Sequence, residues 1–158
     1  MTPRTPWRIF KRSLLLFWAV WLSLVVAGNA ADGLKALGVL PESFRYASCN
    51  YATILEVMAP FGLSAAMGGV LFAGVILWEA VSMSLFWWTG LTFQGFKTAD
   101  RRRLLVATFG VGLGLWGAFQ IVCEAFPSPL AYRLAGTHRL LFTEQLATLL
   151  AVTLLPDD

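Results

Sequence analysis

Four long apolar stretches follow one another along the chain, separated by short segments that hold most of the charged residues. They cover about residues 13–31, 63–88, 104–126 and 140–155. A helix needs about 20 apolar residues to cross the roughly 30 Å of hydrocarbon in a bilayer, and the first three stretches come close to or exceed that length. The pattern predicts an all-α integral membrane bundle of four transmembrane helices in one domain, residues 1–158. The fourth span rests on the shortest stretch.

Composition supports a membrane protein. Hydrophobic residues make up 58% of the chain and charged residues 13%, whereas soluble domains carry about 25% charged residues. Such a chain has too little polar surface to cover a soluble fold.

Basic residues predict the orientation of the bundle. Four lie before the first stretch and four between the second and third: Arg4, Arg8, Lys11, Arg12, Lys97, Arg101, Arg102 and Arg103. The two other connecting segments share only four. Short basic loops stay in the cytoplasm, so both termini are expected there. This topology accounts for the net charge of +3, and no nucleic-acid partner is expected.

The first stretch has a second interpretation. A basic segment, an apolar core and the small residues around Gly28 also resemble a cleavable signal peptide. The apolar core is longer than such peptides usually have, and the charge distribution fits an even number of spans, which favours a retained helix.

Glu79 is the most unusual residue of the second stretch. An ionised carboxylate deep in a membrane costs about 2.5 to 3.5 kcal/mol, so it must be paired, hydrated or protonated. At 100° per residue it shares an inward face with Gly68, Phe72, Val75, Ser82 and Phe86. Ser23 and Thr108 lie at similar depth as candidate partners. A proton or ion relay and a neutral acid that fixes packing are both open, and the lack of a second deep ionisable group favours packing.

Glycines predict close helix contacts. Gly110, Gly114 and Gly117 share one face of the third stretch, and Gly68 and Gly69 lie in the second. Small residues at such spacing let helix backbones approach closely in membranes. The run Gly112, Gly114 and Gly117 also spells a dinucleotide-binding pattern, but that motif needs a preceding strand, which a membrane span excludes.

Polar residues gather toward the predicted outer ends of the spans: Asn29, Asp32, Glu124, His138, Arg139 and Glu144. They could form a layer of ion pairs that caps the bundle, or line a polar pocket for a lipid headgroup or quinone; capping is favoured because such pairs need no ligand. Cys49 and Cys123 are expected on the same side, where an oxidising compartment would permit a disulfide. With His138 as the single histidine, no two-histidine haem site, metal cluster or other cofactor is expected.

Several short motifs resemble a bacterial family of predicted small integral membrane proteins with four spans, a domain of unknown function. The shared residues are Gly28-Asn29 with Asp32, Trp78-Glu79-Ala80, Glu124 with Phe126, Glu144-Gln145 and Leu155-Pro156-Asp157-Asp158. Around the acid of the third span this chain has Cys123 and Ala125 where the family has a glycine and an aromatic residue. The resemblance implies a four-span fold in the bacterial inner membrane and carries no activity.

The sequence contains no nucleophile elbow, phosphate loop or pair of catalytic carboxylates with a base, so an enzyme is not expected. Aromatic-rich spans and short loops favour a non-catalytic accessory subunit that packs against other subunits of a larger bioenergetic membrane complex and against lipids. The alternative is a small proton- or ion-coupled transporter or channel that uses Glu79.

Overall fold

The computed structural model describes residues 6–93 and 98–156, and these form helices and connecting segments without a strand. The order is α1 (Pro6–Ala36), α2 (Asn50–Met58), the short 3₁₀ helix η1 (Ala59–Phe61), α3 (Ala65–Thr92), α4 (Thr98–Ala125) and α5 (Pro129–Leu154). The all-α prediction is confirmed. Each of the four apolar stretches lies largely within one of the long helices.

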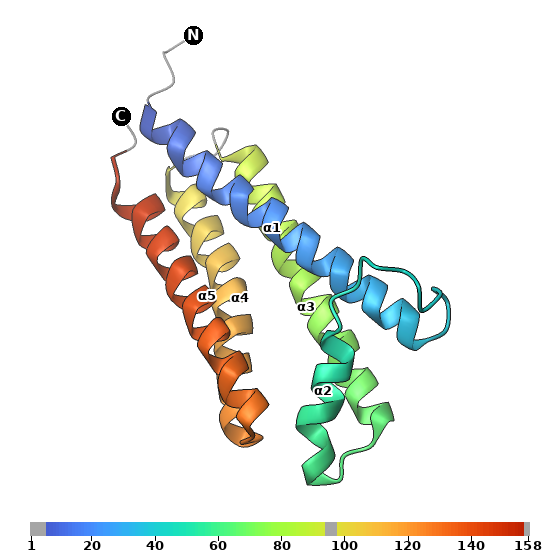
Figure 1. Cartoon of the computed structure of the whole chain (residues 1–158). Helices are drawn as coiled ribbons and strands as arrows, with labels where there is room; N and C mark the ends of the chain where they lie inside the picture. Colours follow the sequence, from blue (N-terminus) through green and yellow to red (C-terminus); the bar gives the residue numbers. More distant parts are fainter. Residues whose placement is uncertain (1–5, 94–97, 157–158) are drawn as a thin grey trace.

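The long helices form two antiparallel pairs, α1 with α3 and α4 with α5 (Figure 1). The start of α1 and the end of α5 lie at the same end of the bundle, where the Lys11 Nζ donates a hydrogen bond to the Leu155 carbonyl at 2.6 Å. Beside it, Arg12 Nε donates to the Gly90 carbonyl of α3 at 3.1 Å. Toward the opposite end the two pairs diverge. We call the first of these the closed end and the second the open end.

Aromatic side chains fill the core toward the closed end. Phe86 of α3 and Phe109 of α4 meet edge to face at 5.0 Å between ring centroids, and Trp18 of α1 lies 6.3 Å from Phe86. Nearby, the hydroxyls of Thr89 and Thr108 are hydrogen-bonded at 2.7 Å. Aromatic contacts and satisfied polar pairs of this kind hold three helices together.

Among the described residues, three helices are long and apolar enough to cross a membrane: α1, α3 and residues 99–125 of α4. This indicates a multi-pass membrane protein. Helix α5 has 26 residues and by the helical rise is about 39 Å long, but its first half carries Arg133, His138 and Arg139. A fourth crossing and the cytoplasmic placement of the termini stay predictions. Two residues that supported this orientation, Arg4 and Lys97, lie outside the described residues.

Two elements near the open end differ from the sequence-based prediction. Helix α5 begins eleven residues before the expected span, at Pro129, where the Ser128 hydroxyl accepts a hydrogen bond from the Ala131 amide at 3.0 Å. The segment between α1 and α3 was expected to be a loop, yet it contains α2 and η1. Helix α2 follows Cys49, whose φ of 61° places it in the left-handed region. Together these elements surround the open end of the bundle.

Candidate functional site

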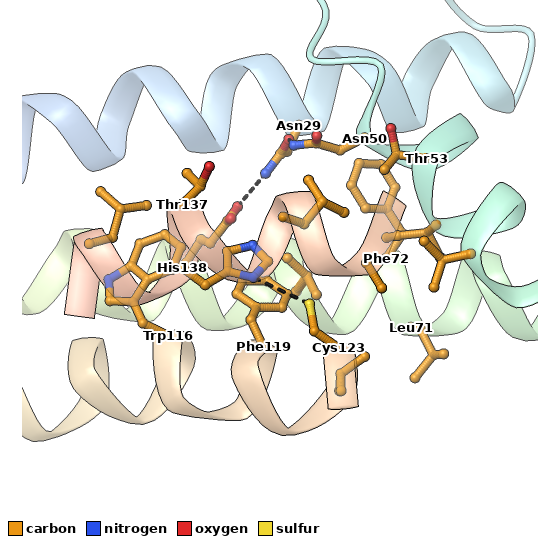
Figure 2. Close-up of a pocket in the computed structure, with 18 of the residues that line it drawn as sticks. Asn29, Asn50, Thr53, Leu71, Phe72, Trp116, Phe119, Cys123, Thr137 and His138 are labelled. Atoms are coloured by element: carbon orange, nitrogen blue, oxygen red, sulfur yellow. Dashed lines mark hydrogen bonds between the residues drawn. The ribbon is translucent and has the colours of Figure 1, made fainter. Parts of the chain in front are cut away.

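A cavity of about 350 Å³ lies between the two helix pairs, toward the open end, and residues from all five α-helices line it (Figure 2). Its lining is mostly aliphatic and aromatic, and its polar side chains are few: Asn29, Asn50, Thr53, Glu79, Cys123, Thr137 and His138. Ligand sites in proteins are typically apolar concavities of about 300 to 1,000 Å³ with a few convergent polar groups. The cavity has this character.

Glu79 lies in the wall formed by α1 and α3, with 2% of its surface exposed. The side-chain amide of Asn29 on α1 donates a hydrogen bond to Glu79 Oε2 at 2.7 Å. Asn50, the first residue of α2, in turn donates to Asn29 Oδ1 at 2.8 Å. Because Asn50 is exposed, three side chains form a hydrogen-bonded chain from the surface to the buried acid.

Glu79 is buried together with Gly68, Phe72, Ser82 and Phe86, which confirms the inward face predicted for α3. The two candidate partners were wrong. Ser23 accepts a hydrogen bond from Trp87 Nε1 at 2.9 Å, and Thr108 pairs with Thr89. Asn29 was expected at the outer rim, but antiparallel packing of the long helix α1 brings it to the level of Glu79.

His138 lies in the opposite wall, formed by α4 and α5. Its Nδ1 is 3.7 Å from Cys123 Sγ, within hydrogen-bond distance for sulfur. Its ring stacks on Phe119 with 4.7 Å between centroids and on Trp116 with 6.3 Å. Figure 2 shows these aromatic side chains gathered on one side of the cavity. Cys123 is buried and Cys49 is exposed, and both are free thiols.

The disulfide considered from the sequence is therefore not formed in this structure. Cys123 faces α5 through its contact with His138. Cys49 follows Ser48, whose amide donates to the Gly28 carbonyl of α1 at 3.1 Å. The two thiols are held by different helix pairs, and the cavity separates these pairs.

The other residues of the expected outer rim lie in separate places. Asp32 docks the start of α2 onto α1, since its Oδ2 accepts from the Tyr51 amide at 2.8 Å and from the Ser48 hydroxyl at 3.2 Å. Glu124 and Arg139 make an exposed ion pair at 3.5 Å between α4 and α5. Glu144 is exposed farther along α5. Only Asn29 and His138 of the expected rim line the cavity.

The glycines of α4 divide between two faces. Gly110 lies on an exposed face, where an added Cβ would have no atom within 4 Å. At Gly114 and Gly117 a Cβ would make ordinary contacts with Trp78 and Phe142. The closest approach is at Gly112, where a Cβ would collide with the side-chain amide of Gln145. On α3, a Cβ at Gly68 would lie 2.6 Å from Leu55 of α2, whereas one at Gly69 would meet only the Tyr51 hydroxyl at 4.0 Å.

Several buried polar atoms have no hydrogen-bond partner among the described residues: Ser82 Oγ, Trp116 Nε1 and both polar atoms of Gln145. Buried polar groups in proteins are normally paired with protein or ordered water. The sequence pattern placed Ser82 on the inward face of the second stretch and indicated no role for Trp116. The signal that could have identified them is the presence of polar atoms in otherwise apolar spans.

Searches with this chain against protein-family models, curated proteins and solved structures found no match. Among the described residues, no cluster of three or more His, Cys, Asp or Glu side chains could hold a metal ion. What the geometry provides is an apolar chamber with a hydrogen-bonded acid on one wall and a stacked imidazole on the other.

Proposed function

We propose that this protein is a non-catalytic membrane subunit that binds a neutral, lipid-like molecule in the cavity between its two helix pairs. The observation that carries the proposal is the cavity itself. Its lining combines extensive apolar surface with a few polar side chains on two opposite walls. This combination suits an amphiphile, whose apolar part fills the chamber while its polar head bonds to these side chains.

A four-span topology with both termini in the cytoplasm is part of the proposal. The contact of Lys11 with the Leu155 carbonyl supports it, because it brings the start of α1 and the end of α5 to the same end of the bundle. Helices α4 and α5 also pack as an antiparallel pair over most of their length (Figure 1). In this topology the cavity lies in the outer half of the membrane, and the bacterial inner membrane is the proposed location.

The bound molecule is best sought in the protein as it is isolated from membranes. Purified protein is extracted with organic solvent, and the recovered lipids are compared with those of the surrounding membrane. Strong enrichment of one neutral amphiphile is expected. An extract with the same composition as the membrane would count against the proposal.

The accessory role concerns the protein's partners. Large apolar side chains cover the outward faces of α1 and α3, among them Phe17, Leu24, Leu77 and Trp88. These faces suit either lipid or the helices of a larger bioenergetic complex. Gently solubilised membranes are expected to yield the chain in a high-mass assembly on native gels. Migration only as a small free protein would contradict the accessory role.

A second function, a proton- or ion-coupled transporter, is favoured by one observation. The chain Asn50–Asn29–Glu79 provides polar steps from the surface to the buried acid. Ionisable residues buried in membrane spans commonly belong to proton or ion routes. A proton flux in proteoliposomes that disappears in Glu79→Gln would place this function above ligand binding.

A further inference from the structure

The wall formed by α4 and α5 presents three aromatic rings, whose planes are inclined by 20° to 39° to one another. The imidazole of His138 is inclined by 20° to Phe119 and by 23° to Trp116, and all three residues line the cavity. Flat ring systems gain both apolar contact and offset stacking against such planes. This wall therefore favours a planar headgroup over a branched or flexible one.

Hydrogen-bonding groups are available on both walls. His138 uses Nδ1 in its contact with Cys123, and its Nε2 has no partner within the part of the chain that the structure describes. When the thiol donates to Nδ1, Nε2 carries the proton and can donate to a ligand. On the opposite wall, Asn29 donates to Glu79 Oε2, and Oε1 has no described protein partner. When Glu79 is protonated, Oε1 can carry the proton and donate to a ligand. A ligand with polar atoms on two opposite sides can use both walls.

The charge of the cavity lining restricts the class of ligand further. Within the described ranges, no lysine or arginine lines the cavity, and the one acidic residue in its lining is Glu79. A phosphate or carboxylate placed here would be buried without a cation and beside an acid, which is strongly unfavourable. Phospholipid headgroups and fatty acids are therefore poor ligands. The volume of about 350 Å³ also lies near the lower limit for ligand sites, enough for one ring and the start of a tail.

We infer that the cavity binds the headgroup of an isoprenoid quinone. Such a headgroup is neutral and flat, and its two carbonyl oxygens lie on opposite sides of the ring. In this binding mode one carbonyl accepts a hydrogen bond from His138 Nε2, the ring lies against the aromatic wall, and the second carbonyl faces the Asn29–Glu79 pair. The inference rests on the proposed function, since it names the ligand class of the same cavity, and it assigns binding without electron transfer.

The test uses the full chain in nanodiscs, titrated with decylubiquinone while tryptophan fluorescence is recorded. Trp21 and Trp116 line the cavity, so bound quinone should quench them in a saturable way. His138→Phe keeps an aromatic plane but removes the donor, and should weaken binding about ten-fold or more. Tyr132→Phe is the matched control on α5, because Tyr132 is exposed and does not line the cavity. It should bind like wild type.

A second variant covers the case in which His138→Phe does not fold. Val75→Phe adds a ring inside the cavity, whereas Val81→Phe adds the same ring on an exposed position of α3. Only Val75→Phe should lose the saturable quenching. Equal quenching in all variants would mean simple partition into the bilayer and would overturn the inference.

A competing ligand separates this inference from the proposed function. Dodecanol is a neutral amphiphile without a ring, and it should displace decylubiquinone only weakly. If dodecanol binds as tightly as the quinone, the quinone inference is overturned and the proposed function stands. If neither ligand binds in a saturable way, both are overturned.

Discussion

At the scale of single residues, Glu79 owes its place to a hydrogen bond that apolar periodicity does not reveal. The inward face of α3 followed from the 100° helical repeat, and burial confirms it. The hydrogen-bond partner of Glu79 could not be predicted from the helical repeat, because the register between α1 and α3 is set by side-chain packing along both helices. Asn29 was visible in the sequence as a polar residue, but its depth relative to Glu79 depends on that register.

The hydrogen bond from Asn29 to Glu79 gives a first stability prediction. Glu79→Gln keeps the length of the side chain and an oxygen that accepts from Asn29, so it should melt close to wild type. Glu79→Ala leaves the Asn29 amide unpaired in a buried site and should cost about 1 to 3 kcal/mol. Thermal melting in detergent measures both variants. Equal damage from Gln and Ala would point to an ionised Glu79 with a role that the neutral amide cannot fill.

Gly112 and Gly110 make a matched pair for a second prediction. Gly112→Leu would force a side chain into the position of Gln145, which is fully buried, and should destabilise the fold by about 1 to 3 kcal/mol. Gly110→Leu introduces the same residue two positions earlier on an exposed face and should have little effect. Melting temperatures in one detergent decide the comparison. Greater damage at Gly110 would show that its face meets a partner helix.

At the scale of elements, apolar stretches predicted the long helices well, because burial in a bilayer or a bundle requires long apolar runs. The start of α5 was predicted too late, although Ser128 and Pro129 form a recognisable N-cap and first-turn pair. Helix α2 has only nine residues and no side-chain cap. Its position depends on contacts with α1 and α3, and such a short helix has no strong local signal in the sequence.

Docking of α2 through Asp32 leads to a third prediction. Asp32→Ala removes the acceptor for the Tyr51 amide and the Ser48 hydroxyl. Amide hydrogens of residues 50–58 should then exchange faster with solvent, since the start of α2 loses its attachment to α1. Hydrogen–deuterium exchange followed by mass spectrometry measures this.

Glu42→Ala is the control for that experiment. The Glu42 side chain is 91% exposed, and its described ion-pair partner is Lys35. Its removal should leave exchange in α2 unchanged, because an exposed pair contributes little to stability. Equal acceleration in both variants would reflect a general loosening of the connecting segment. The Asp32 contacts would then not be what holds α2 in place.

At the scale of the whole molecule, the topology gives a fourth prediction. Reporters fused after residue 158 and within residues 97–103 should both report the cytoplasm, while one near Glu42 should report the outer side. The two terminal helix ends meet at the closed end, which supports this arrangement. A carboxyl terminus on the outer side would mean that α5 does not cross the membrane.

The central claim is that the cavity between the helix pairs holds a neutral amphiphile. The sequence favoured a capping layer of ion pairs and left a polar pocket at the rim as the alternative. The depth of the cavity and its aromatic wall could not be predicted, because they arise from the divergence of two helix pairs (Figure 1). Separate apolar stretches do not specify such a divergence.

Native mass spectrometry of the protein released from nanodiscs tests this claim most directly. Wild type and Val81→Phe should each carry one bound neutral molecule. Val75→Phe, whose added ring occupies the cavity, should lose most of that bound mass while it keeps its fold by circular dichroism. Retention of the same ligand by Val75→Phe, or a wild-type protein released without any bound molecule, would contradict the account.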